Sequence, residues 1–546
     1  MNIAEEMVQS LEEKGVRYLF GVPGEENIDF LEAVRNSSIQ FILTRHEQTA
    51  AMMAAMVGRL TGIPGVCLST LGPGAVNLAT GVATANADGL PLIAIAGQAE
   101  TNRLHHPSHQ MVDLPEFFRP ITKWSTTIRH SSAPRETIEK AFNLAMSEKP
   151  GAVFIELPED LAVKEGDSVT GIASALGRVE AAEIDMKRAA EQINAAEMPL
   201  ILAGAGTLRG KASREVAALS EKLCASVLET FMGKGAVSWR LDTHLAAAGT
   251  WGRDWADEAI DKADLVLAIG YDYIEYSPVR WNKERKQVVH INWQEAEVDA
   301  HYPVVASLIG DLSCNLARLT ELVRERTALP APFAELRRKI RQEWEEAGQD
   351  TAFPLKPSKI LYDLRAAMND DDLVVCDVGA HKVWLGRMFP VFAPDTCFIS
   401  NGLATMGVAL PGAIAAKLVK PERRVVAVCG DGGFLMNVQD LETAARLKLP
   451  LVILLWRDGG YGLIEWKQLE KFRHSHHVTF GNPDFVHLAR SFGIEGCRVE
   501  KGEELRPLLE KALHAEGPVL IDCPVDYREN LKLEEKIRFG CGDETR

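Results

Sequence analysis

Two aspartates in the C-terminal third of the chain each follow an apolar run. Asp431 lies in the glycine-rich turn 430–433, after a buried strand expected over residues 423–429. Asp458 ends the next apolar run, a strand expected over residues 450–456. Both acids therefore lie at the carboxyl ends of strands, where open α/β sheets bind ligands. Glycines let the backbone approach a ligand, and a helix N-terminus offers N–H groups to an anion. Two carboxylates beside such a site predict a hard cation that bridges them to a phosphate.

A third acid, Glu47, follows a short strand expected over residues 39–43. A run of helix-forming residues begins just after it, at Ala50. A carboxylate at the start of a helix is stabilised by the positive end of the helix dipole, so a structural role is the first interpretation.

The elements that position these acids form an internal repeat. A strand at residues 66–70, a glycine turn, a helix at 75–87 and a Leu-Pro strand at 90–95 make the first copy. The second copy runs over residues 423–454, with its helix expected at 437–448. The repeat predicts two related α/β domains.

A third α/β segment lies between the two copies. Residues 199–206 and 263–270 both predict buried strands that end at glycine. The turn at 203–206 lacks the full dinucleotide fingerprint, so we interpret it as structural. The fold class is therefore α/β, with three doubly wound parallel-sheet domains.

Two segments separate the expected domains. The first boundary falls within residues 164–183 and the second within 327–358, where a charged helix at 335–347 predicts a solvated connector. The resulting division is residues 1–165, 183–345 and 355–530, followed by a C-terminal tail at 531–546.

Composition narrows the class of protein. Of 546 residues, 46% are apolar and 25% charged, which is typical of soluble globular proteins. A net charge of −16 argues against a nucleic-acid partner. The nine cysteines include no Cys-x-x-Cys pair, which favours reduced thiols in the cytoplasm. No signal peptide and no apolar run of membrane-spanning length is visible, so no membrane partner is expected.

Taken together, these motifs resemble the thiamine diphosphate-dependent enzymes. That family has a Gly-Asp-Gly turn, a helix, a strand and then Asn or Asp, and its cofactor glutamate lies in an Arg-His-Glu triplet, here residues 45–47. The resemblance covers about residues 1–530. It is strongest to acetolactate synthases of the catabolic, flavin-independent kind, through residues 109–113, 120–124 and 456–461. It implies thiamine diphosphate and Mg²⁺ as cofactors and argues against FAD.

The resemblance also implies roles for individual residues. Glu47 would hydrogen-bond the aminopyrimidine ring and promote the tautomer that removes the thiazolium proton. Gln110 would orient the acceptor substrate, and His109 would handle protons. The implied metal ligands are Asp431, Asp458 and the carbonyl oxygen of Gly460.

Further residues would contact the cofactor in the first, pyrimidine-binding domain and the third, diphosphate-binding domain. Met406 would hold the cofactor bent, the Ala404 carbonyl would accept from the aminopyrimidine, and His381 would donate to a phosphate. The full implied set is Pro23, Asn77, Gly379, His381, Ala404, Met406, Gly432, Gly433, Tyr461, Leu463 and Ile464.

Three features depart from the synthase pattern or compete with it. Lys467 stands where synthases often have Gln or Trp, and residues 25–27 differ from the usual turn. Both leave the acceptor substrate open. The histidine cluster at 474–477 could suggest a transition-metal site, but it lacks partners at convincing spacing, so we predict an exposed loop.

The leading functional prediction is decarboxylation of pyruvate and carboligation to a second pyruvate, giving 2-acetolactate and CO₂. A 2-oxoacid decarboxylase that releases an aldehyde shares every cofactor residue and stays open. A non-catalytic nucleotide-binding or regulatory protein is the alternative from another class. In relatives the cofactor bridges two subunits, so we expect a homodimer or homotetramer with active sites at the subunit interface.

Overall fold

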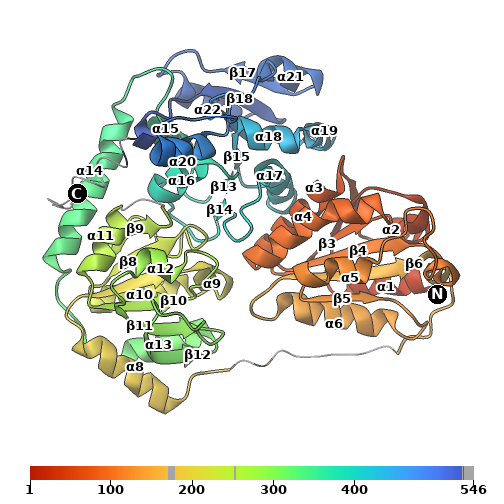
Figure 1. Ribbon diagram of the computed structural model, residues 1–546, viewed down its shortest axis with the longest axis horizontal. Helices are drawn as coiled ribbons and strands as arrows, with labels where there is room; N and C mark the ends of the chain where they lie inside the picture. Colours follow the sequence, from red (N-terminus) through yellow and green to blue (C-terminus); the bar gives the residue numbers. More distant parts are fainter. Residues whose placement is uncertain (170–176, 178, 251–253, 532, 534–546) are drawn as a thin grey trace.

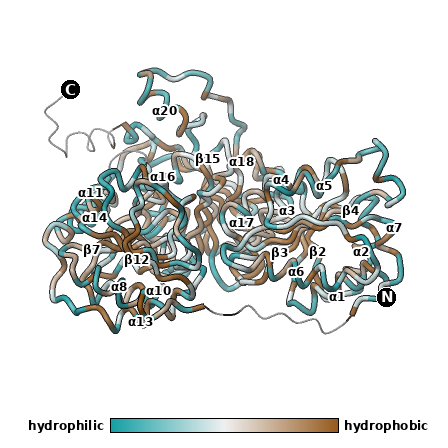
Figure 2. Tube along the Cα trace, turned by 60° about the horizontal axis from the view of Figure 1, so that its bottom comes forward, coloured by the Kyte–Doolittle hydropathy of each residue, from teal (hydrophilic) through white to brown (hydrophobic). Residues whose placement is uncertain are grey.

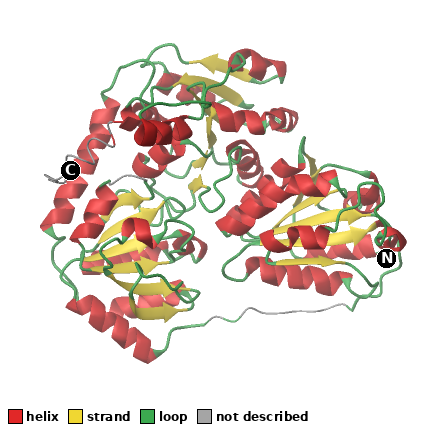
Figure 3. Cartoon of the chain, in the orientation of Figure 1, coloured by secondary structure: helices red, strands yellow, loops and turns green. Residues whose placement is uncertain are grey.

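The structure is a computed structural model that describes residues 1–169, 177, 179–250, 254–531 and 533 (Figure 1). Most of the expected tail at 531–546 and part of the expected boundary at 164–183 lie outside the described residues. Helices flank three separate sheets, each six-stranded and parallel throughout (Figure 3). The predicted α/β class with three parallel-sheet domains is therefore confirmed. Among the described residues, no helix combines the length and the apolar character needed to cross a membrane.

The first sheet has the strand order β2-β1-β3-β4-β6-β5. Its strands are β1 (Tyr18–Gly21), β2 (Gln40–Leu43), β3 (Gly65–Ser69), β4 (Leu92–Gln98), β5 (Trp124–Thr127) and β6 (Ala152–Pro158). Its helices are α1 (Ile3–Glu13), α2 (Ile28–Arg35), α3 (Glu47–Thr61), α4 (Pro73–Asp88), α5 (Leu114–Phe118), α6 (Pro134–Met146) and α7 (Glu159–Ala162). Strands β3, β4 and β6 are buried along their whole length, as expected for parallel strands covered on both faces.

The third sheet repeats this topology, with the order β14-β13-β15-β16-β18-β17. Its strands are β13 (Leu373–Cys376), β14 (Cys397–Ile399), β15 (Val425–Gly430), β16 (Val452–Arg457), β17 (Glu495–Arg498) and β18 (Val519–Pro524). Its helices are α15 (Pro357–Ala367), α16 (Ala380–Met388), α17 (Ala409–Val419), α18 (Asp431–Met436), α19 (Leu441–Arg446), α20 (Gly462–Phe472), α21 (Phe485–Ser491) and α22 (Leu505–Ala512). The two copies of the sequence repeat occupy equivalent places, since β3 and β4 correspond to β15 and β16.

The central sheet has a different order, β12-β11-β10-β7-β8-β9. Its strands are β7 (Pro199–Ala203), β8 (Ser226–Thr230), β9 (His244–Ala248), β10 (Leu265–Ile269), β11 (Gln287–Asn292) and β12 (Val304–Ile309). The helices of this region are α8 (Glu183–Ala195), α9 (Ala205–Arg209), α10 (Ser213–Leu223), α11 (Trp255–Lys262), α12 (Pro278–Trp281), α13 (Leu312–Leu322) and α14 (Ala331–Gly348).

The first and third domains of the chain share one hydrophobic core. Helix α3 packs between α4 and α17 (Figure 1), and small side chains such as Ala50, Ala54, Ala413 and Ala416 are fully buried in this core. Figure 2 shows hydrophobic residues concentrated in the interior of the domains. Alanine faces allow close approach of the helices, so the interface fixes the two domains against each other.

Two local predictions need correction. The helix expected at 437–448 is present only in part, as a 3₁₀ turn at Val438–Asp440 followed by α19, and α18 precedes it, because Asn437 leaves helical geometry with φ −131° and ψ 24°. The side-chain amide of Asn437 donates to the Gly407 carbonyl at 2.8 Å. Helix α14 is not a solvated connector, because it buries Phe333 and Trp344 against its neighbours.

Candidate functional site

The Asp431 carboxylate is buried at the start of α18 and is surrounded by N–H donors. Oδ1 accepts from the Gly432 backbone at 2.8 Å. Oδ2 accepts from the backbone of Asp458 at 3.2 Å and of Gly459 at 2.8 Å. It also accepts from Nδ2 of Asn482 at 2.7 Å. These donors fix the carboxylate at the end of β15 and tie it to the end of β16.

Asp458 brings a second carboxylate to the same place. Burial, and then the neighbouring Asp431 carboxylate, raise the pKa of Asp458 to about 8. A cation between the two acids would relieve this repulsion. The described residues contain no group of three or more His, Cys, Asp or Glu side chains that could hold a metal ion. A hard cation here would need further oxygen ligands besides these two carboxylates, which suits Mg²⁺ shared with a phosphate.

A cavity of about 170 Å³ lies beside this acidic pair. The predicted residues that line it are Gly379, His381, Ala404, Met406, Asp431, Gly432, Gly433, Asp458, Gly460, Tyr461, Leu463 and Ile464. Val378, Ala380, Gly430, Gly462 and Tyr527 complete the lining. The third domain thus brings together all the residues that the resemblance assigned to it.

An unpartnered ring nitrogen and close glycines suit this cavity to a phosphate group. His381 is buried and its Nε2 atom has no hydrogen-bond partner. Burial, with the charge of Lys382, lowers the pKa of His381 to about 3, so the ring is neutral. A Cβ atom at Gly379 or Gly430 would lie 2.8 Å or 3.0 Å from that ring. A neutral imidazole can donate one hydrogen bond to a phosphate oxygen.

The first domain holds a second group of predicted residues. Glu47 is the first residue of α3 and is only 8% exposed. Its Oε2 atom accepts from Nδ2 of Asn77, on α4, at 3.0 Å. A Cβ atom at Gly74 would lie 3.2 Å from Oε1, so the first turn of α4 leaves little space around the acid. Glu47 is therefore a buried carboxyl with one side-chain donor.

Gln110 and Pro23 lie at the margins of this group. The Gln110 backbone has φ +55° and packs on Gly72, where a Cβ atom would lie 2.5 Å from the Gln110 carbonyl oxygen. His109, beside it, is exposed, and Pro23 is exposed in the turn after β1. Among the described residues, none from the first domain lines the cavity beside Asp431. A single chain therefore keeps the two groups apart.

Sequence reasoning missed two residues of the third-domain site. Asn482 holds Asp431 from 51 positions away, and Tyr527 lines the cavity from the end of the domain. Neither stands in a motif, so only the fold shows them.

Lys467, singled out from the sequence, and Lys123, from the synthase-like segment 120–124, both make local contacts. Lys123 donates to the Ser147 carbonyl at 2.6 Å and to the Lys149 carbonyl at 2.7 Å, so it braces a loop. Lys467 lies on α20 and pairs with Glu470 at 3.2 Å. His474, His476 and His477 are exposed, as predicted for a surface loop.

Comparisons with known proteins give the same assignment as the geometry. The chain matches three parts of the thiamine pyrophosphate enzyme family: the N-terminal TPP binding domain at residues 1–117, the central domain at 186–319 and the C-terminal TPP binding domain at 377–523. It is 40% identical to an acetolactate synthase of Bacillus subtilis, over 97% of this chain and 94% of that protein. It is 36% identical to a catabolic acetolactate synthase of Raoultella terrigena, over 98% and 97%.

A more distant relative extends the comparison. The isozyme 2 large subunit of acetolactate synthase from Escherichia coli is 31% identical, over 97% of both chains. The non-catalytic alternative is set aside by these matches together with the assembled site. The chain belongs to the thiamine pyrophosphate enzyme family and is an enzyme of the acetolactate synthase type.

Proposed function

We propose that the protein converts two molecules of pyruvate into 2-acetolactate and CO₂, with thiamine diphosphate and Mg²⁺ as cofactors. The observation that carries the proposal is the acidic pair of Asp431, which is buried, and Asp458 beside a cavity lined by neutral His381. The acetolactate synthases among the relatives support the choice of reaction. When bound, the cofactor supplies a thiazolium ring that accepts the electrons released by decarboxylation.

The third domain would hold the charged end of the cofactor. Asp431, Asp458 and the Gly460 carbonyl would ligate Mg²⁺, and Asn482 keeps Asp431 in place. His381 would donate to a phosphate oxygen, while the glycines around it let the phosphate approach the backbone.

The first domain would supply the proton chemistry and the acceptor site. Glu47, oriented by Asn77, would share a proton with a ring nitrogen of the cofactor. By the resemblance, Gln110, which packs on Gly72 at the start of α4, would orient the second oxoacid, and the neighbouring His109 would handle protons. Orientation matters here because the two reacting carbons must meet at bonding geometry.

We further propose that two copies of the chain complete each site. In one chain the described residues of the first domain do not line the cavity beside Asp431. Apolar side chains are exposed on both halves: Val76 is 40% exposed near Asn77, and Ile464 is 51% exposed at the cavity. A homodimer, or a homotetramer of two dimers, would cover these side chains and join the halves. A reducing, cytoplasmic location fits the free thiols of the eight described cysteines.

Product analysis tests this proposal. The protein is incubated with pyruvate, thiamine diphosphate and Mg²⁺, without FAD, and acetolactate and acetaldehyde are both measured. We expect acetolactate as the main product. Acetaldehyde as the main product would replace the synthase with the decarboxylase, and the absence of both would reject the proposal.

A further inference from the structure

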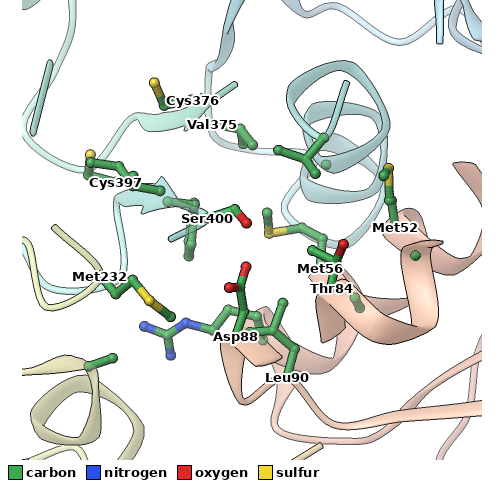
Figure 4. A pocket seen from close by; sticks show the side chains of 18 of the residues that line it. Met52, Met56, Thr84, Asp88, Leu90, Met232, Val375, Cys376, Cys397 and Ser400 are labelled. Carbon is green, nitrogen blue, oxygen red and sulfur yellow. The ribbon is translucent and has the colours of Figure 1, made fainter. Parts of the chain in front are cut away.

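The C-terminal end of α4 contacts the loop that carries Ala404 and Met406. Asp88, the last residue of the helix, is 6% exposed, and its Oδ1 atom accepts from the Gly402 backbone at 2.7 Å. A Cβ atom at Gly402 would lie 2.6 Å from the Ala87 carbonyl oxygen, so the contact requires glycine. Figure 4 shows the Asp88 carboxylate directed toward Ser400 at the margin of a cavity of about 80 Å³ that all three domains line.

Thr84, one turn earlier on α4, makes a second contact with the same loop. Its Oγ1 atom lies 2.8 Å from that of Thr405. Thr84 uses its one hydroxyl proton to donate to the Thr80 carbonyl at 2.7 Å. Thr405 is therefore the donor of the bond between the two hydroxyls. Residues 84 and 88 share one face of the helix, so α4 holds the loop on both sides of Ala404.

The loop needs such contacts because its backbone is unusual. Ala404 has φ +54° and Gly407 has φ +89°. Both lie in the left-handed region, which residues other than glycine rarely adopt. Such geometry persists where surrounding contacts over-determine it. The far end of the loop is fixed within the third domain, since Gly407 donates to Asp377 at 2.7 Å and accepts from Asn437 at 2.8 Å. At its start, Asn401 donates to the Glu275 carbonyl of the central domain at 2.7 Å. Among the described residues, Gly402 and Thr405 are held by Asp88 and Thr84 of the first domain.

We propose that Asp88 and Thr84 are positioning residues for the cofactor's organic rings, and that they act through the loop at residues 401–407. This inference rests on the proposed function. In a dimer the first domain would then do two things at once: it would fix the loop of its own chain and offer Glu47 to the site of the partner. Asp88 and Asn77 lie at opposite ends of α4, about 16 Å apart along its axis. One helix would therefore contact two active sites.

Binding of two ligands to the purified full-length protein tests the proposal. Calorimetry with Mg²⁺ present measures the Kd of thiamine diphosphate and, separately, of inorganic diphosphate. Asp88→Ala should weaken thiamine diphosphate binding about tenfold, because a buried hydrogen bond to the loop is lost. Inorganic diphosphate should stay within about twofold of the parent protein, because it uses only the groups around Asp431 and His381. Asp88→Asn keeps an acceptor oxygen and should bind thiamine diphosphate much more tightly than Asp88→Ala.

Two further variants keep the test decisive if Asp88→Ala folds poorly. Thr84→Val removes the acceptor of the Thr405 hydroxyl at nearly constant shape and should also weaken thiamine diphosphate alone. Thr80→Ala changes an exposed side chain on the same helix and serves as the control. Equal weakening of both ligands, or unchanged affinity for thiamine diphosphate, would overturn the proposal. If the parent protein binds neither ligand, the proposed function itself fails.

Discussion

Asn77 and Glu47 come from different helices and meet at 3.0 Å, with the amide of Asn77 donating to Oε2 of the acid. Glu47 begins α3, and Asn77 lies in the second turn of α4. The bond orients a buried carboxyl and occupies only one of its oxygens. Glu47 is thereby held with Oε1 available to a ligand.

Glu47→Gln should separate proton transfer from cofactor binding. Glutamine keeps the shape and can still accept from Asn77, but it cannot relay a proton. We expect the Kd for thiamine diphosphate to change little and turnover to fall by about 10²-fold or more. Hydrogen–deuterium exchange at the thiazolium carbon of the bound cofactor should slow in parallel. Unchanged exchange would remove Glu47 from the mechanism.

The acidic pair predicts a requirement for one divalent cation. Asp431→Ala should greatly weaken cofactor binding, because it removes a ligand and leaves the donors of Asn482 and Gly459 without an acceptor. Asp458→Asn should be milder, since an amide oxygen can still ligate Mg²⁺. Titration of cofactor binding with Mg²⁺ after chelation measures both effects. Equal cofactor affinity with and without metal in the parent protein would contradict the assignment.

The third-domain site could be predicted because its motifs are local. Asp431 and Asp458 each end an apolar strand, and β15 and β16 are neighbours in the sheet. The repeat likewise gave the equivalence of the first and third domains, because strand, turn and helix follow each other within about 30 residues.

The rest depends on tertiary contacts that no local pattern contains. Asn482 reaches Asp431 from a distant loop, and Asn437 leaves the helix to bond with Gly407. The buried face of α14 was missed because its charged residues dominate the pattern, while Phe333 and Trp344 find partners only in the fold.

Subunit complementation should follow from the split site. A Glu47→Gln chain and an Asp431→Ala chain, each inactive alone, should regain activity when co-expressed, because a mixed dimer has one intact pair of halves. If the subunits mix at random, at most about a quarter of all sites are intact, so at most about a quarter of the parent activity should return. Cells that express only the Glu47→Gln chain serve as the control. An active monomer, shown by sedimentation, would defeat this prediction.

Arg387 is expected to stabilise the junction between the central and third domains. It is nearly buried, and it donates to Asp254 at 2.7 Å and to Glu343 at 2.9 Å. Arg387→Ala would leave two partly buried carboxylates without their counter-charge, so we expect a loss of about 3–5 kcal/mol. Thermal unfolding measures it, with Arg506→Ala, an exposed pair on α22, as the control. An unchanged midpoint would show that water satisfies both acids.

Glu275 should make stability fall as pH rises. It is buried beneath the backbone N–H groups of Ala205 and Asp272, and burial raises its pKa from 4.5 to about 7. Between these values the folded protein keeps a proton that the unfolded chain has released. The contribution of Glu275 to the free energy of unfolding is therefore full below pH 4.5. It falls between pH 4.5 and about 7, by up to about 1.4 kcal/mol per pH unit. Above pH 7 it adds no further change.

Glu275→Gln removes this titration while keeping the shape of the side chain. The unfolding midpoints of the parent and of Glu275→Gln are compared from pH 5 to pH 8. Their difference isolates Glu275 from groups such as His381, whose lowered pKa makes stability change with pH in the opposite direction. We expect the parent to lose stability relative to the variant over this range, with the difference levelling off above about pH 7. Glu510→Gln, the same substitution at an exposed position on α22, serves as the matched control. If the difference in unfolding midpoint between the parent and Glu275→Gln does not change with pH, the folded protein keeps Glu275 ionised despite its burial.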